Sequence, residues 1–234
     1  MSLTDIAILA ALFFLTSIVG VVTGSNSLIT VPLMFQFGIE EKTAVATNMF
    51  GLTFMAIGGT IPFLRQGKIE AGKLMPVIVL TLIGSACGAL LVGYITGASI
   101  KLIVSIAMIA VVVFTLLRRE HVERRWMPVI GYSAAFLLAI YGGLYSGGYV
   151  TILTAAFVAF LGMDYAESVG STKFVNVFSS SIATLVFMWQ GLVDYKLGAI
   201  LAVTMFAGAY VGAHYAAKMN EVWLRRIFLS TVVI

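Results

Sequence analysis

The stretch Ile6-Ala-Ile-Leu-Ala-Ala-Leu-Phe-Phe-Leu-Thr-Ser-Ile-Val-Gly-Val-Val22 carries no charged side chain. An α-helix needs roughly 20 consecutive, mostly apolar residues to cross the hydrocarbon core of a bilayer. Apolar runs of similar length recur along the whole chain, and short charged segments separate them. The pattern predicts an all-α fold, a polytopic transmembrane helical bundle.

The overall composition excludes a water-soluble fold. Of the 234 residues, 61% are hydrophobic and only 10% are charged, with a mean hydropathy of +1.06, whereas soluble domains carry roughly 25% charged residues. The basic residues behind the net charge of +4 lie mostly in short segments between apolar runs. This placement indicates contact with anionic lipid headgroups. We therefore expect the lipid bilayer, and no nucleic acid, as a partner.

The apolar runs predict the following eight membrane spans: about 5–22, 44–64, 74–95, 99–117, 128–146, 166–189, 197–217 and 222 to the end of the sequence. Two further apolar stretches, about 24–37 and 148–161, are short for a complete crossing. We predict that these two stretches are re-entrant segments or halves of broken helices.

The chain repeats itself at an offset of 124 residues. The residues Gly24, Thr30, Gly38, Val45, Thr60, Phe63, Gln66, Gly67, Val79, Gly84, Gly88 and Ala89 recur as Gly148, Thr154, Gly162, Val169, Thr184, Phe187, Gln190, Gly191, Val203, Gly208, Gly212 and Ala213. We predict two homologous four-helix repeats, residues 1–117 and 128–234, joined by a charged cytoplasmic linker, 118–127. Four crossings per repeat would make the halves parallel, and an odd number would invert them; the sequence leaves both open.

Basic residues set an expectation for orientation. With the linker in the cytoplasm, a regular count of eight spans also places Arg65, Lys68 and Lys73 there. The same count places Lys218, Arg225 and Arg226 on the opposite side. The expected orientation of the second half is therefore in conflict with the positive-inside rule.

Two interruptions rich in Gly, Ser and Thr fall at membrane depth, one in each half. They run from Gly20 to Pro32 and from Gly142 to Thr154. Irregular backbone at this depth is tolerated only where it is buried in protein or lines a wet cavity, and a helix that restarts there points its positive N-terminus inward. The candidate donors to a substrate are Ser25, Asn26, Ser27, Ser146, Gly147 and Gly148. The alternative is that these segments are hinges or kinks.

Lys173 is the one Lys or Arg set well within a predicted span. A charge at the bilayer centre costs roughly 2.5 to 3.5 kcal/mol on the insertion scale. A bound anion or a carboxylate such as Glu167 would offset this cost; alternatively, the side chain snorkels to the headgroups. Helical spacing places Asn176 on the same face as Lys173. The polar residues predicted to shape the pocket around it are Thr47, Asn48, Thr172 and Asn176.

Close helix packing is predicted at two glycine pairs. Gly84 and Gly88 share one helix face, and Gly208 and Gly212 share another. Small residues at this spacing let neighbouring backbones approach closely in lipid. We assign these pairs to packing and not to substrate binding.

Catalysis has little support in the sequence. His121 and His214 lack metal-ligand spacing, and a single cysteine, Cys87, excludes a cysteine pair. We predict no enzyme activity, no catalytic residue, no metal site and no cofactor. No phosphate-binding loop is present, so any transport would depend on an ion gradient, the substrate's own gradient or a partner.

Coupling to protons is open, as is a homo-oligomer. The acids Glu40, Glu41, Asp164 and Glu167 are candidates for proton coupling. Acids at helix starts more often act as N-terminal caps or topology markers.

The chain resembles the sulfite exporter TauE/SafE family, also called the TSUP family. The resemblance rests on Gly24 through Val31-Pro32-Leu, Phe37-Gly38 and Ala44-Val-Ala-Thr47 in the first half. In the second half it rests on Ser171-Thr-Lys-Phe-Val-Asn176, Gln190-Gly-Leu-Val193, Gly208-Ala-Tyr-Val-Gly-Ala213 and Leu224-Arg-Arg-Ile-Phe228. It implies a multi-pass permease of the prokaryotic plasma (inner) membrane for small sulfur-containing or organic anions such as sulfite, sulfonates or sulfoacetate. The first half has Gly24-Ser-Asn-Ser27 where the family often has a run of glycines, so its substrate does not transfer directly.

The sequence thus predicts a secondary transporter whose small anionic substrate lies between the two repeats. Two other classes are kept as alternatives. One is a passive channel for anions or small solutes, which would not show counterflow. The other is a non-transporting membrane subunit of a complex, which would move nothing alone in liposomes.

Overall fold

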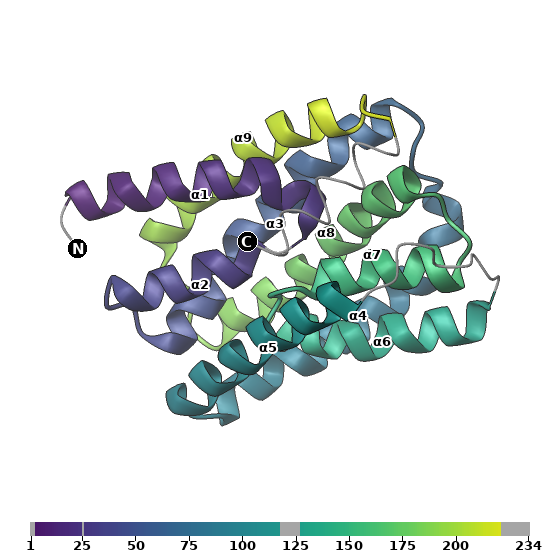
Figure 1. Cartoon of the computed structure of the whole chain (residues 1–234). Helices are drawn as coiled ribbons and strands as arrows, with labels where there is room; N and C mark the ends of the chain where they lie inside the picture. Colours follow the sequence, from purple (N-terminus) through teal and green to yellow (C-terminus); the bar gives the residue numbers. More distant parts are fainter. Residues whose placement is uncertain (1–2, 25, 118–126, 221–234) are drawn as a thin grey trace.

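The fold is a bundle of helices, as predicted. The computed structural model describes residues 3–24, 26–117 and 127–220, and its elements within these ranges are helical (Figure 1). They are α1 (Leu3–Thr23), α2 (Asn26–Gln36), α3 (Glu41–Arg65), the 3-10 helix η1 (Ala71–Leu74), α4 (Met75–Tyr94), α5 (Gly97–Leu117), α6 (Pro128–Leu144), α7 (Tyr149–Phe160), α8 (Tyr165–Trp189) and α9 (Tyr195–Ala216).

Each predicted span before residue 218 corresponds to one long helix, and the span from 222 onward lies outside the described residues. By length and composition, the helices apolar enough to cross a bilayer in the described part of the chain are Thr4–Thr23, Glu41–Arg65, Ala71–Tyr94 and Tyr195–Ala216. The two short apolar stretches form separate helices, α2 with 11 residues and α7 with 12. The predicted linker, residues 118–127, lies outside the described residues except for Met127.

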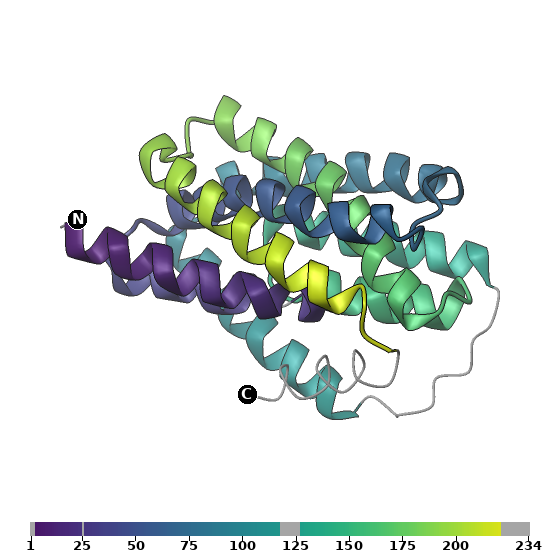
Figure 2. The ribbon, with the colours of Figure 1, turned by 90° about the horizontal axis from the view of Figure 1, so that it is seen from above.

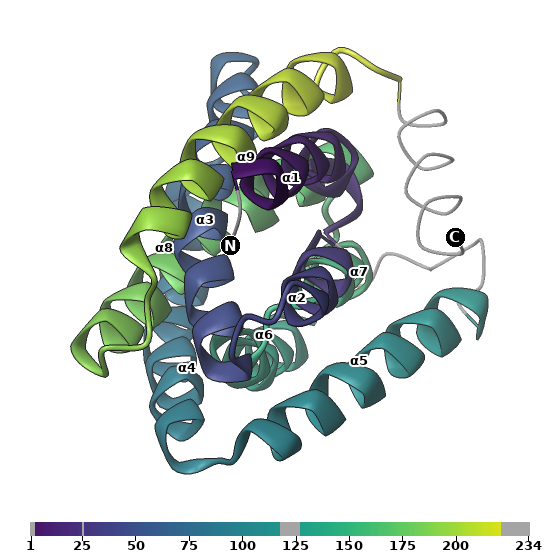
Figure 3. The same cartoon turned by 90° about the vertical axis from the view of Figure 1, so that its left-hand side faces the viewer.

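The short helices form two hairpins that enter the bundle from opposite ends. In Figure 1, α1 begins at the left end and α2 turns back toward it, whereas α6 begins at the right end and α7 turns back toward that side. The hairpin tips meet, because Thr151 Oγ1 donates to Thr23 O over 2.7 Å and Tyr145 OH donates to Ser27 O over 2.9 Å. Viewed end-on in Figure 3, α3 and α8 lie on one side of the bundle and α1, α2 and α7 on the other.

Several structural features recur at the 124-residue offset. Helices α3 and α8 begin and end at positions 124 apart. The glycines with positive φ in the described chain form pairs at the same offset: Gly24 and Gly148, Gly38 and Gly162, Gly67 and Gly191. The predicted duplication stays a prediction that these features support, and the opposite entry of the hairpins favours an inverted relation over a parallel one.

The glycine pairs pack helices closely, as predicted. A Cβ at Gly88 would lie 1.9 Å from Ile140 O of α6, and a Cβ at Gly212 would lie 2.1 Å from Ile18 O of α1. Figure 2 shows α1 beside α9. Only glycine permits these two helix crossings, because any side chain would collide with the facing backbone.

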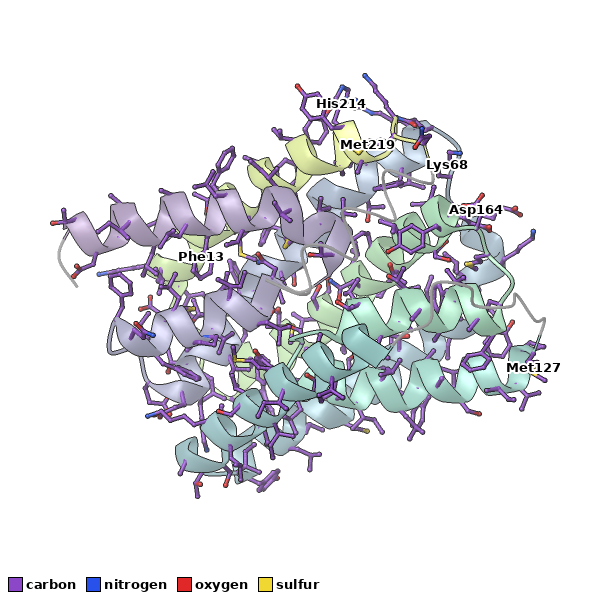
Figure 4. All side chains as sticks on the ribbon, viewed as in Figure 1. Phe13, Lys68, Met127, Asp164, His214 and Met219 are labelled. Carbon is purple, nitrogen blue, oxygen red and sulfur yellow. The ribbon has the colours of Figure 1, made fainter. Side chains whose placement is uncertain are left out.

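The expected position of Lys218 is wrong. Arg65 Nη1 donates to Tyr210 OH over 3.3 Å, Tyr210 stacks on His214, and His214 Nε2 lies 2.9 Å from Lys218 Nζ. Lys218 therefore lies at the same end of the bundle as Arg65, where Figure 4 also places Lys68. The regular span count failed because each hairpin returns toward the end from which it started. With this correction, Lys218 no longer conflicts with the positive-inside rule, whereas Arg225 and Arg226 lie outside the described residues.

Candidate functional site

The two predicted interruptions meet at the centre of the bundle. Ser27 Oγ lies 2.7 Å from Ser146 Oγ, and Tyr141 OH donates to the Gly147 carbonyl within the second interruption. Gly24 adopts a φ of 75°, and a Cβ there would lie 2.7 Å from Thr151 N. The left-handed conformation and the close approach both require glycine at this tip.

Both short helices start at this meeting point. Helix α2 begins at Asn26, and α7 begins at Tyr149 directly after Gly148 in the left-handed conformation. Helix N-termini carry partial positive charge and unpaired N–H groups. Two of them facing one region favour a bound anion there.

A small cavity of about 10 Å³ lies beneath the hairpin tips. It has room for roughly one water molecule. Five of the predicted site residues line it: Asn26, Ser27, Ser146, Lys173 and Asn176. The structure thus brings both interruptions and the polar face of α8 to one place.

Lys173 is buried, with 3% of its surface exposed. Its Nζ donates to Gly20 O of α1 over 3.3 Å, and no carboxylate of the described residues forms an ion pair with it. Snorkelling is therefore excluded, since the side chain does not reach the protein surface, and the structure shows no pairing with Glu167. The Lys173 side chain lies in the bundle centre, and among the described residues its Nζ has one backbone carbonyl as its hydrogen-bond partner.

Asn26 is equally buried, at 3% exposure. Within the described part of the chain, neither its Oδ1 nor its Nδ2 has a hydrogen-bond partner. A buried polar group left unpaired costs about 1 to 3 kcal/mol. Asn26 thus presents an unused donor and an unused acceptor beside the only buried lysine of the described residues.

Asn48 lies one layer behind the cavity. Its Nδ2 donates to Ser27 Oγ over 2.9 Å, and its Oδ1 accepts from Thr30 Oγ1 over 2.7 Å. Thr172 forms the corresponding contact in the second half, with its Oγ1 at 3.1 Å from Thr154 Oγ1. These residues hold α2 against α3 and α7 against α8, and neither lines the cavity.

The remaining predicted residues also lie away from the cavity lining. Thr47 Oγ1 accepts from Asp194 N over 3.0 Å, which ties α3 to the start of α9. Gly147 and Gly148 shape the turn before α7. Ser25 lies outside the described residues.

The sequence did not predict some of the residues that line the central cavity. The additional lining residues are Gly20, Gly24, Leu52, Met55, Ala56 and Val150. The glycines stand within the interruption that the sequence marked, but no signal separated Leu52, Met55 and Ala56 from ordinary core positions. A second hollow of about 250 Å³, between α1 and α2, shares Gly20 and Asn26 with the cavity.

The candidate acids serve as caps and surface partners. Glu40 accepts from Thr43 N over 2.8 Å, and Asp164 accepts from Glu167 N over 2.7 Å. Glu41 pairs with Lys101 at 2.6 Å. Among the described residues, no group of three His, Cys, Asp or Glu could hold a metal ion. Coupling to protons therefore stays a prediction.

Comparison with known proteins gives consistent matches over nearly the whole chain. A family model described as "Sulfite exporter TauE/SafE" matches residues 9–234. The probable membrane transporter protein ORF9 of Sinorhizobium sp is 27% identical over 217 residues, which cover 89% of this chain and 83% of ORF9. The probable membrane transporter protein YfcA of Escherichia coli (strain K12) is 26% identical, with 93% and 84% covered. The probable membrane transporter protein YdhB of Bacillus subtilis (strain 168) is 26% identical, with 97% and 96% covered. No solved structure matches the chain.

Proposed function

Since this chain belongs to the sulfite exporter TauE/SafE family, and is thus a membrane transporter and not an enzyme, we propose that it is a secondary transporter of small anions. The substrate binds between the hairpin tips and α8, in the central cavity. Sulfur-containing or organic anions such as sulfite, sulfonates or sulfoacetate are the candidate substrates, in keeping with the family's description. The proposal places the transporter in the bacterial plasma (inner) membrane, and it is supported by relatives named as membrane transporter proteins of bacteria.

The observation that carries this proposal is the buried Lys173 without an ion-pair partner among the described residues. Ionisable residues inside membrane proteins are expensive and most often mark a substrate or ion pathway. An anion would offset the desolvation of Lys173 and would also accept a hydrogen bond from the unused Nδ2 of Asn26. The N-termini of α2 and α7 add positive potential to the same region.

Transport requires the hairpin tips to part. The cavity of about 10 Å³ is too small for sulfite or a sulfonate. The contacts that close it are the Ser27 to Ser146 pair and the bonds from Tyr145 and Thr151 across to the first hairpin. Movement of one hairpin relative to the other would open the site to either end in turn. These closed contacts favour an alternating-access transporter over a passive channel.

The test is anion uptake by purified protein in liposomes, with sulfite, thiosulfate, sulfate, sulfonates and short carboxylates, with and without a pH gradient. Saturable uptake of at least one anion is expected, and Lys173→Ala should abolish it. Lys196→Ala is the matched control, because Lys196 is exposed at the start of α9. If the Lys173 variant is folded and transports normally, Lys173 is not in the site. If no anion is taken up, the alternative of a non-transporting membrane subunit of a complex is favoured.

A further inference from the structure

The two longest helices present opposite chemistry to the central cavity. Helix α8 contributes Lys173 and Asn176, whereas α3 contributes Leu52, Met55 and Ala56. The spacing of the α3 residues puts them on one helix face. All three are buried, so this face is part of the cavity wall and is not turned to lipid. The cavity therefore has one cationic, polar wall and one apolar wall.

The asymmetry falls at positions that are 124 residues apart. Leu52 of α3 stands at this offset from Asn176 of α8, and Asn26 of α2 stands at it from Val150 of α7. All four residues line the cavity. At each pair of positions one half supplies an amide and the other an apolar side chain. The two halves thus do not match at these positions, although α3 and α8 run over matching ranges, and the difference in wall polarity lies between α3 and α8.

This polarity distinguishes two kinds of small anion. An inorganic oxyanion carries hydrogen-bond acceptors on every side. The oxygen that faces Leu52 and Met55 would lose its hydrogen bonds to water, and no protein donor would replace them. An organic anion can direct its head to Lys173 and a short alkyl group to α3. Met55 is unbranched and can move to admit such a group.

We infer that the substrate is a small organic monoanion with a short alkyl group, and that Leu52 and Met55 select it over inorganic oxyanions. The single charge follows from Lys173, the one cationic side chain among the described residues that line the cavity. This inference rests on the proposed function, since it assumes that the central cavity is the transport site.

The test compares uptake of methanesulfonate with uptake of sulfate and perchlorate by the whole protein in liposomes. All three anions are tetrahedral. Methanesulfonate differs from sulfate by a methyl group in place of one oxygen and by one charge, and perchlorate, with a chlorine centre and four oxygens, is the inorganic anion that matches methanesulfonate in charge. One methyl or methylene group in an apolar pocket changes specificity by roughly 10 to 200-fold. The unchanged protein should therefore prefer methanesulfonate over both inorganic anions by about tenfold or more.

Leu52→Asn places at position 52 the residue type that stands at position 176. It should lower the preference for methanesulfonate by about tenfold, while the remaining uptake still depends on Lys173. Leu52→Met is the matched control and should keep the preference, because it conserves volume and polarity. Met55→Gln tests the same wall if Leu52→Asn does not fold.

The outcomes separate the two proposals. The inference is overturned if uptake is saturable and depends on Lys173 but shows no preference for methanesulfonate. It is also overturned if the folded variants Leu52→Asn and Met55→Gln leave the preference unchanged. Either result leaves the proposed transporter function intact. Absence of saturable uptake of every anion, including those of the wider panel, overturns both.

Discussion

Replacing Lys173 with methionine should abolish transport and at the same time stabilise the protein. A lysine held within the bilayer costs roughly 2.5 to 3.5 kcal/mol on the insertion scale. The hydrogen bond from Lys173 Nζ to Gly20 O returns about 1.5 kcal/mol, the low end for a charged group, because at 3.3 Å it is long. The Gly20 carbonyl keeps a second bond from Gly24 N at 2.9 Å, so the change leaves no unpaired acceptor. The free energy of unfolding should therefore rise by about 1 to 2 kcal/mol.

The assay pairs unfolding in mild detergent with anion uptake in liposomes for the same preparation of Lys173→Met. A lysine retained for binding lowers stability, whereas a lysine retained for packing raises it. Lys196→Met, on the exposed start of α9, should change neither quantity. A loss of about 3 kcal/mol or more in the unfolding free energy of Lys173→Met, the amount expected when a buried pair is broken, would contradict this prediction, as would intact uptake.

Three further substitutions test the central contacts. Asn26→Val should reduce anion uptake at least about tenfold. Its thermal stability should not fall, because the change removes a polar group that is unpaired in the structure. A destabilised variant would show that the amide has a structural role. Gly24→Ala should lower the melting temperature and uptake, since φ is 75° and the new Cβ would lie 2.7 Å from a backbone nitrogen, whereas Gly72→Ala meets no atom within 4 Å and should behave as the unchanged protein. Ser27→Ala removes the contact with Ser146 and the acceptor of the bond from Asn48 Nδ2, and it should lower stability by about 1 to 3 kcal/mol. If the Ser27 to Ser146 pair holds the tips closed, the rate of uptake should rise; slower uptake would argue against a closing role.

The helical class follows from the sequence alone because uncharged apolar runs leave few alternatives. The hairpins do not follow from it in full. A stretch such as residues 24–37 is too short for an ordinary crossing, yet its length does not say whether it turns back or crosses. This single ambiguity reversed the expected position of Lys218, which the contacts from Arg65 through Tyr210 and His214 place at the basic end.

The candidate site was predictable where its residues violate the apolar pattern. Lys173 and the glycine-rich interruptions stand out in any membrane span, and the structure brings them together. Thr47 and Asn48 are equally polar, but sequence does not distinguish a residue on the cavity wall from one that supports it from behind. Leu52 carries no signal at all, because an apolar residue that faces a binding cavity has the same hydropathy as one in the core.

Counterflow of methanesulfonate and of sulfite would show directly whether the protein carries anions through a site built around Lys173. Liposomes that contain the purified protein are loaded with the unlabelled anion, and entry of the labelled anion is followed over time. A transient accumulation of label above its outside concentration is expected for at least one of these anions, and no such accumulation is expected with Lys173→Met. A pore would give simple equilibration. Equilibration without overshoot for both anions, or an equal overshoot in the Lys173 variant, would contradict a transport site built around Lys173.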